Sequence, residues 1–295
     1  MIQHTIKEKI ESYLFVLPAF LLVSVLLLYP MLENVYLSFF KYSGLGKPVF
    51  VGLQNYTRAY MDSNFKLSFI NTLIWVVFTV AVPVTSSLVV AVFLRNMKGS
   101  NFYKLVFFLP LTLSFVSTGI IWMNFFSSNN GVLNTVLSLF TGGSRVKISW
   151  LVHVPLNTIS MLIAWTWQQL GMSMVLFLMG LTTIPNDPIE ASIIDGANKW
   201  QTFVHITFPM LRPITTVVIT QAIVNSFKTF DLIYVMTSGG PYRSSETLAV
   251  TMYRETFTMF NLGYGSAISV ILSAIIILIS GWYVRKQMSH DMLHY

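Results

Sequence analysis

Residues able to carry out covalent chemistry are sparse and scattered in this sequence. It has no cysteine, which excludes disulfides, thiolate catalysis and cysteine-ligated metals, and its five histidines are isolated, without a His-Glu-x-x-His pattern. No pair of carboxylates is placed for acid–base work. The stretch SGLGKPVF (43–50) contains Gly-Lys like a phosphate loop, but Lys41 stands where that loop needs glycine, and Pro48 replaces its Ser or Thr. We therefore expect no enzymatic activity, no metal and no nucleotide hydrolysis in this chain.

Polar side chains suited to binding rather than catalysis gather inside two long apolar stretches. An unpartnered buried hydroxyl costs about 1–3 kcal/mol. A path for a polyhydroxylated solute between apolar helices would therefore need amides and hydroxyls, with aromatic faces for the C–H side of a ring. The residues that form this candidate substrate path are Trp165, Gln168, Gln169, Asn225, Ser226, Lys228, Thr229 and Asp231.

These residues also have structural interpretations. The amides can hydrogen-bond between helices without contacting any solute. Lys228 and Asp231, at positions i and i+3 of one predicted helix, can form an ion pair, or they can line or gate a watery path. The residues alone leave these alternatives open.

Six apolar stretches of membrane-spanning length are the elements that position these side chains. The chain has 295 residues, of which 54% are hydrophobic and 10% charged, whereas soluble domains carry about a quarter charged residues. About 20 residues cross the ~30 Å hydrocarbon core. We expect spans near Ser12–Tyr29, Ser68–Leu94, Leu105–Phe126, Pro155–Leu181, Ile214–Met236 and Ser266–Tyr283. The predicted fold class is all-α, a polytopic membrane protein with six transmembrane helices.

The distribution of basic residues predicts an orientation. Six spans place both termini on one side, and the short segments on that side are denser in Lys and Arg, so we expect cytoplasmic termini. The prediction is a cytoplasmic segment over residues 1–11, a membrane domain over 12–284 and a cytoplasmic tail over 285–295. The net charge of +7 is spread singly over loop ends, so we expect a lipid bilayer as partner and no nucleic acid.

A polar segment at about 185–213, between the fourth and fifth stretches, is predicted to form two short helices outside the bilayer. Asp187 is a good N-cap, and Gly196 should end or bend the first helix because glycine tolerates positive φ. The second helix should run from Asn198 towards Thr207, before two prolines disturb the approach to the fifth span. Such a segment either rests its apolar side on lipid headgroups or docks into a groove on a soluble partner.

The spacing in this segment resembles the EAA motif of ABC-importer permeases, E-A-A-x-x-D-G-A followed by I-x-x-P. Here it reads EASIIDGA (190–197), with Ser192 in place of the second alanine and with Ile206 and Pro209 completing the ending. In that family, the type I importers with the MetI-like permease fold, the segment is the coupling helix that docks into the ATPase subunit. The resemblance implies an ATPase-coupling role for Glu190, Ala191, Asp195, Gly196, Ala197 and Trp200.

A second stretch, NSFKTFDLIYVMTSGGPYRSSETL (225–248), resembles the N-x-F-x-x-F-D-x-I-Y…T-x-G-G-P…T signature of MalF/UgpA-type permeases, which import sugars and related compounds. The likeness covers the chain from the first span onward. The mid-membrane sugar pocket of that family then falls on most of the candidate path, together with Met172 and Ala222.

The resemblance implies a permease subunit of an ATP-driven importer that translocates a sugar or oligosaccharide delivered by an extracytoplasmic solute-binding protein. It implies a heterodimer with a second, MalG-type permease, two ATP-binding subunits that use ATP and Mg, and a place in the bacterial inner membrane, with no cofactor bound by this chain. Because of Lys228, another polar solute such as glycerol phosphate stays an alternative substrate. An autonomous secondary transporter or channel is the alternative of another class, and it would need intramembrane acidic relays or internal repeats.

Overall fold

The computed structural model describes residues 6–141 and 145–291, and regular structure within them is almost entirely helical. The strands of this described part, β1 (Phe40–Lys41) and β2 (Val49–Phe50), form one short antiparallel hairpin. The all-α prediction is confirmed. The chain divides into two compact units, one made of residues 1–62 and 252–273 and the other of residues 63–251 and 274–295.

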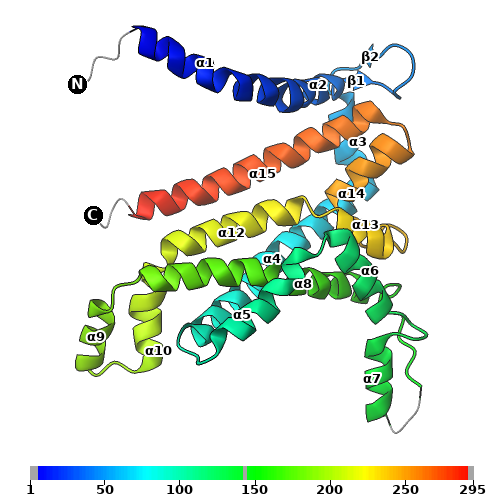
Figure 1. Ribbon diagram of the computed structural model, residues 1–295. Coiled ribbons are helices and arrows are strands. Elements are labelled where there is room, and N and C mark those ends of the chain that lie inside the picture. Colours follow the sequence, from blue (N-terminus) through cyan, green and yellow to red (C-terminus); the bar gives the residue numbers. More distant parts are fainter. Residues whose placement is uncertain (1–5, 142–144, 292–295) are drawn as a thin grey trace. The chain divides into compact units, whose positions relative to one another are not determined.

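The first unit contains the N-terminal helices, the hairpin and the start of the last helix (Figure 1). Its helical elements are α1 (Ile6–Val23), a π-helical turn (Ser24–Leu28), α2 (Tyr29–Leu37), α3 (Gln54–Met61), a second π-helical turn (Arg254–Thr258) and the beginning of α15 (Leu262–Asp291). Asn55 holds α3 against the hairpin, because its Nδ2 donates to the carbonyl oxygens of Ser38 and Phe40, both at 2.9 Å.

The second unit contains most of the helices. Its elements are α4 (Ser63–Arg95), α5 (Ser100–Phe108), a 3₁₀ turn (Leu109–Thr112), α6 (Phe115–Phe125), α7 (Val132–Phe140), α8 (Leu156–Thr183), α9 (Asp187–Ile194), α10 (Lys199–Thr202), a π-helical turn (Phe203–Thr207), α11 (Phe208–Met210), α12 (Arg212–Phe227), α13 (Asp231–Thr237) and most of α14 (Leu248–Tyr253). α4 packs along α8, and α12 packs against α4.

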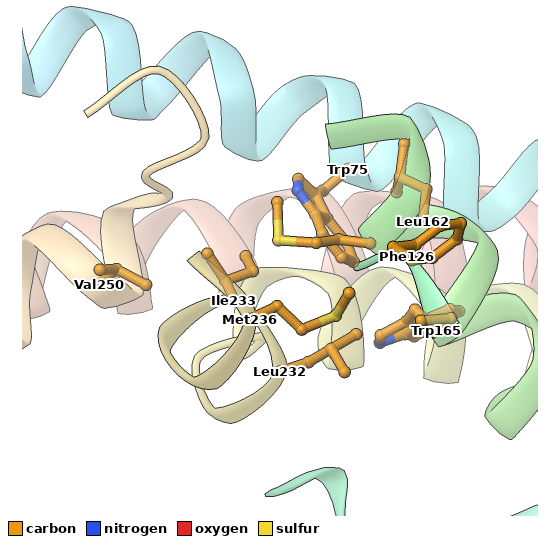
Figure 2. Close-up of a cluster of buried hydrophobic side chains, with 10 residues drawn as sticks. Trp75, Phe126, Leu162, Trp165, Leu232, Ile233, Met236 and Val250 are labelled. Atoms are coloured by element: carbon orange, nitrogen blue, oxygen red, sulfur yellow. The ribbon is translucent and has the colours of Figure 1, made fainter. Parts of the chain in front are cut away.

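The core of the second unit has two apolar clusters. In one of them Trp75 of α4 and Trp165 of α8 gather with Leu232 and Met236 of α13 (Figure 2). The other lies further along α8, around Phe177, and includes residues of α4 and α12. The polar residues described below are therefore held between helices whose packing is fixed by large buried side chains.

By length and composition, the described residues contain four helices able to cross a membrane: Leu14–Leu37, Ser63–Arg95, Leu156–Thr183 and Leu262–Gln287. Two further candidates are bent helix pairs. Ser100–Thr112 and Phe115–Phe125 meet at 102°, and Lys199–Met210 and Arg212–Phe227 meet at 71°. The predicted six spans are reached only if each bent pair counts as one span.

The prediction that the third and fifth spans are continuous helices is wrong. The third breaks at Leu113, whose backbone is extended, and Ser114 then caps α6 by accepting a hydrogen bond from the Ser117 N–H at 3.1 Å. The fifth breaks after Phe227, because the carbonyl of Thr229 leaves the helical ladder and accepts a hydrogen bond from the Thr247 hydroxyl at 3.2 Å.

The predicted terminal segments are helical where the structure describes them. α1 begins at Ile6, inside the predicted cytoplasmic segment 1–11, of which residues 1–5 lie outside the described residues. α15 runs to Asp291, inside the predicted tail 285–295, of which residues 292–295 likewise lie outside the described residues.

Candidate substrate path and coupling segment

A narrow polar crevice runs between α4, α8 and α12. Trp165 and Gln169 of α8 line it together with Gln221 and Asn225 of α12, and Pro83 inside α4 lies opposite. Its volume is about 10 Å³, which is room for about one water molecule. The crevice therefore brings candidate residues of two predicted spans together, in a form too narrow for a sugar.

A wider hollow of about 130 Å³ opens at the break between α12 and α13. Asn225, Lys228, Thr229 and Asp231 line it, with Phe115 from the start of α6. Asn225 also lines the crevice, so its side chain belongs to both cavities. The two breaks in predicted spans thus meet at one cavity, and four candidate path residues face it.

The predicted placement of Lys228 and Asp231 on one continuous helix is wrong. Lys228 is the C-cap of α12, and Asp231 is the first residue of α13. Both side chains are exposed, and in the described part of the chain they form no ion pair with each other. The hollow at the break therefore carries one cation and one anion on its wall.

Gln168 and Ser226 point away from both cavities. The Gln168 Nε2 donates to the carbonyl oxygen of Leu113 at 2.7 Å, so this side chain holds the break in the third predicted span. The Ser226 hydroxyl donates to the carbonyl of Ile223 at 2.7 Å and is buried. The bond of Gln168 therefore agrees with the alternative that the amides join helices, whereas the bond of Ser226 stays within its own helix.

Trp165 belongs partly to the apolar core. Its side chain is only 2% exposed and packs in the cluster of Figure 2. Within the described residues, its indole N–H and the Oε1 of Gln168 are buried polar atoms that have no hydrogen-bond partner. Unsatisfied buried donors and acceptors of this kind are rare in folded proteins.

The sequence reasoning missed a polar network that anchors the loop after α13. Arg243 pairs with Glu246 through two hydrogen bonds, of 2.8 and 2.6 Å, and Glu246 is 1% exposed. Asn71 of α4 donates to the carbonyl oxygens of Ser244 and Glu246 at 2.8 and 3.0 Å. Asn157 at the start of α8 donates to the carbonyl of Gly240 at 3.1 Å. Asparagines within predicted apolar spans were the signal that could have indicated it.

The coupling segment forms a helical hairpin between the ends of α8 and α12 (Figure 1). α9 ends at Ile194, and Gly196 follows its C-cap with a φ of +83°, in agreement with the prediction that Gly196 ends or bends this helix. The Gly196 N–H donates to the Ile193 carbonyl at 3.1 Å and the Ala197 N–H donates to the Ser192 carbonyl at 2.9 Å, which is the pair of bonds of a Schellman motif. The predicted N-cap is wrong by one residue, since Asn186 precedes the helix and Asp187 opens its first turn.

The second helix of the hairpin begins as predicted at Asn198. Asn198 and Gln201 form a reciprocal capping box, with hydrogen bonds of 2.9 and 2.8 Å. Ser192 and Thr202 join the two helices through a buried hydroxyl contact of 3.0 Å. The small hydroxyl in place of the motif's second alanine therefore has a defined partner.

The outward surface of this hairpin is apolar. Ile193, Ile194 and Trp200 are 63%, 85% and 71% exposed. The predicted coupling residues Glu190, Asp195 and Gly196 are also exposed, and Gly196 and Asp195 border a shallow hollow of about 390 Å³. A rigid two-helix element thus presents large apolar side chains and carboxylates outside the helical bundle.

A family of membrane transport proteins matches this chain from the middle of α4 to near the end of α15. It is described as binding-protein-dependent transport system inner membrane component, and the match covers residues 84–286. The chain belongs to this permease family. The hairpin between α8 and α12 and the hollow at the break between α12 and α13 lie within the matched residues.

Relatives of the permease align with nearly its whole length. The osmoprotective compounds uptake permease protein GgtC of a Synechocystis species is 35% identical over 286 residues, which cover 95% of this chain and 100% of that protein. The alpha-glucoside transport system permease protein AglF of Rhizobium meliloti is 31% identical over 288 residues, covering 95% of this chain and 83% of that protein.

A solved structure has the same fold. A chain of the bacterial alginate ABC transporter, crystallised in complex with an alginate pentasaccharide-bound periplasmic protein, superposes with a TM-score of 0.83. The two chains are 17% identical, and the match covers 94% of each. The predicted fold of an ABC-importer permease is confirmed, and the permease is a membrane-embedded transport component.

Proposed function

We propose that the permease is one of two membrane subunits of an ATP-driven importer for a neutral, polyhydroxylated solute such as a sugar or oligosaccharide. It would pair with a second, homologous permease subunit and receive the solute from an extracytoplasmic binding protein. Two separate ATP-binding subunits, which use ATP and Mg, would dock on the hairpin between α8 and α12. This chain would itself bind no cofactor and hydrolyse no nucleotide.

The coupling hairpin is the observation that carries this proposal. Its two helices are locked by the turn at Gly196 and by the Ser192–Thr202 contact, so a force applied to α9 is passed on to α10. Exposed Ile194 and Trp200 supply the apolar surface that a helix-in-groove contact buries. An interfacial helix that merely rests on lipid would not need such a fixed turn.

The lining of the cavities supports a neutral polar solute. Gln169, Gln221 and Asn225 offer amide donors and acceptors, and Trp165 offers an aromatic surface. Lys228 and Asp231 both line the wider hollow. Their opposite charges offset each other, so the hollow does not favour a solute of one charge over a neutral one. The relatives named for osmoprotective compounds and for alpha-glucoside agree with this class.

The location follows from the same reasoning. The docking of ATP-binding subunits requires the hairpin to face the cytoplasm, which places both termini of a six-span chain there as well. The bacterial inner membrane is the membrane in which such importers meet an extracytoplasmic binding protein. The distribution of Lys and Arg supports this orientation.

A thiol-crosslinking experiment tests the docking surface, and the chain is suited to it because it has no cysteine. Ile194→Cys in the hairpin would be paired with cysteines in the groove of the co-expressed ATP-binding subunit, in membranes of cells that make the whole importer. We expect a crosslink that ATP modulates. Leu139→Cys in α7, which is 77% exposed, is the matched control and should give none. Crosslinking from Leu139→Cys, with none from Ile194→Cys, would overturn the assignment.

Uptake assays test the solute class. Proteoliposomes with the complete importer should accumulate a neutral oligosaccharide and not glycerol phosphate, and only when binding protein and ATP are present. Gradient-driven uptake by this chain alone would instead establish an autonomous transporter. Uptake of glycerol phosphate in preference would shift the class to anionic solutes and assign Lys228 as the contact.

A further inference from the structure

The first unit holds a cavity of about 650 Å³ that plays no part in the proposed transport function. Its volume is larger than those of the crevice and of the two hollows described in the second unit. It lies within the range of about 300–1,000 Å³ typical of small-molecule sites. The hairpin of β1 and β2 forms one wall, and α3 and the start of α15 form the others. The cavity is therefore built from segments far apart in the sequence.

Its charged lining is entirely basic. Lys41 and Lys47 from the hairpin and Arg58 from α3 line it, and the lining contains no Asp or Glu. In the described part of the chain, neither lysine forms an ion pair, and both are exposed. These two ammonium groups are available to an anionic ligand.

Arg58 is fixed in place by its neighbours. Its guanidinium lies 3.8 Å from the centre of the Tyr264 ring and 3.4 Å from the Oε2 of Glu255. Tyr264 in turn donates from its hydroxyl to the Asp62 carboxylate at 3.0 Å, and Asn261 donates to Glu255 at 3.0 Å. This wall of the cavity is therefore preorganised, with Arg58 still 48% exposed.

The backbone keeps the walls together. A Cβ at position 263 would lie 1.9 Å from the carbonyl oxygen of Phe40, so only glycine lets the start of α15 approach β1 this closely. The Gly263 N–H donates to the carbonyl of Tyr42 at 3.2 Å. The spacing between the basic hairpin and the start of α15 is thus set by direct contact.

The rest of the lining combines polar side chains with an apolar patch from the hairpin. Leu45, Val49 and Val51 line the cavity beside the lysines, and Leu45 is 86% exposed. Phe50, next to them in β2, is 68% exposed. A soluble anion would make no use of these apolar side chains in binding. An amphiphile with an anionic head group, by contrast, has a charged part for the lysines and an apolar part for the hairpin side chains.

The cavity adjoins the ends of two candidate membrane spans. The hairpin closely follows the candidate span Leu14–Leu37, and Tyr264 is near the beginning of the candidate span Leu262–Gln287. Lysine and tyrosine side chains at the ends of spans typically reach into the headgroup region. Basic pockets between membrane-spanning helices are known to bind the headgroups of anionic lipids.

From these observations we infer that the cavity binds the phosphate headgroup of an anionic phospholipid, with Lys41, Lys47 and Arg58 as its ligands and Leu45, Val49 and Val51 against the glycerol and upper acyl chain. The site would fix the hairpin to the membrane surface. It is independent of the solute that the permease carries.

Amine labelling of the full-length permease in nanodiscs tests the inference. Acetylation of each lysine would be followed by mass spectrometry in discs of phosphatidylcholine and in discs that also contain phosphatidylglycerol. We expect Lys41 and Lys47 to be acetylated about fivefold more slowly with phosphatidylglycerol, since each basic residue near an anionic surface gains roughly that factor in binding. Lys98, exposed after the end of α4, is the internal control for the general effect of a charged membrane.

Two further arms identify the source of the phosphate and the residues. Inorganic phosphate or glycerol phosphate, added to phosphatidylcholine discs, should leave the labelling unchanged. Native mass spectrometry should find one retained phosphatidylglycerol fewer in Lys47→Gln than in Lys98→Gln, and Lys47 is exposed enough that its replacement should not disturb folding. Equal labelling in both discs would overturn the inference, as would equal lipid retention by the two variants or equal protection by the soluble anions.

Discussion

The turn at Gly196 offers the sharpest test of how the coupling hairpin works. Its φ is +83°, and a Cβ added there would meet nothing within 4 Å, so a substitution is strained by backbone conformation alone. An L-residue in the left-handed region costs about 1–2 kcal/mol. In Gly196→Ala, the undocked hairpin can change its turn and so avoid this strain. If docking on the ATP-binding subunit requires the original turn, the docked hairpin must carry the strain. Docking should then weaken about 5- to 30-fold.

The assay is the ATPase activity of the complete importer in proteoliposomes, with and without solute-loaded binding protein. Stimulation by loaded binding protein should fall in Gly196→Ala and fall further in Gly196→Val, because a β-branched residue fits positive φ worse than alanine. The affinity of the binding protein for solute should not change.

Gly99→Ala is the matched control for this experiment. Gly99 has a φ of +75°, and a Cβ there would also meet nothing within 4 Å, so it carries the same strain outside the hairpin. Its ATPase stimulation should stay at the wild-type level. Wild-type stimulation in Gly196→Val, in a complex that assembles normally, would refute the reasoning that the turn transmits force.

Three further substitutions test the other parts of the site. Gln168→Leu removes the hydrogen bond to the Leu113 carbonyl, and it should lower the stability of the purified permease by about 1–3 kcal/mol, read from thermal unfolding; an unchanged midpoint would contradict the bracing role. Glu246→Ala removes the buried carboxylate that pairs with Arg243, and it should destabilise the permease by about 3–5 kcal/mol, with Glu246→Gln losing nearly as much because it also removes the charge; wild-type stability in Glu246→Gln would contradict an ionic role. Asn225→Ala, which alters the wall of both cavities, should raise the solute concentration for half-maximal uptake about tenfold without changing basal ATPase; unchanged uptake would remove Asn225 from the path.

Features decided by neighbouring residues were predictable from the sequence. The termination of α9 before Gly196 and the start of α10 after Asn198 follow from local backbone and capping chemistry, and both agree with the predictions. The all-α fold and the four long spans follow from hydropathy, because in a bilayer the backbone must satisfy its own hydrogen bonds. The error of one residue at Asp187 is of the size usual for helix ends.

Features decided by distant partners were not predictable. The third span breaks at Leu113, whose carbonyl is held by a glutamine 55 residues away. The fifth breaks where Thr247 takes over the carbonyl of Thr229, and Asn71 reaches the carbonyl of Glu246 across 175 residues. A hydropathy pattern reports that a stretch belongs in the membrane, but it says nothing about such tertiary bonds, so the predicted helices were drawn straight through both breaks.

The 71° bend at Leu211 has a mechanical consequence. The helical stretch Lys199–Met210 acts as a stiff arm about 18 Å long, so a rotation of about 10° at the bend displaces its far end by about 3 Å. Leu211 is 1% exposed and packs against Gly180 of α8, which puts the pivot inside tightly packed side chains and not in a loose loop. Packed cores of this kind rearrange between discrete arrangements and do not deform continuously. Small, graded displacements at the tip should therefore be converted into an all-or-none repacking of α8 against α12.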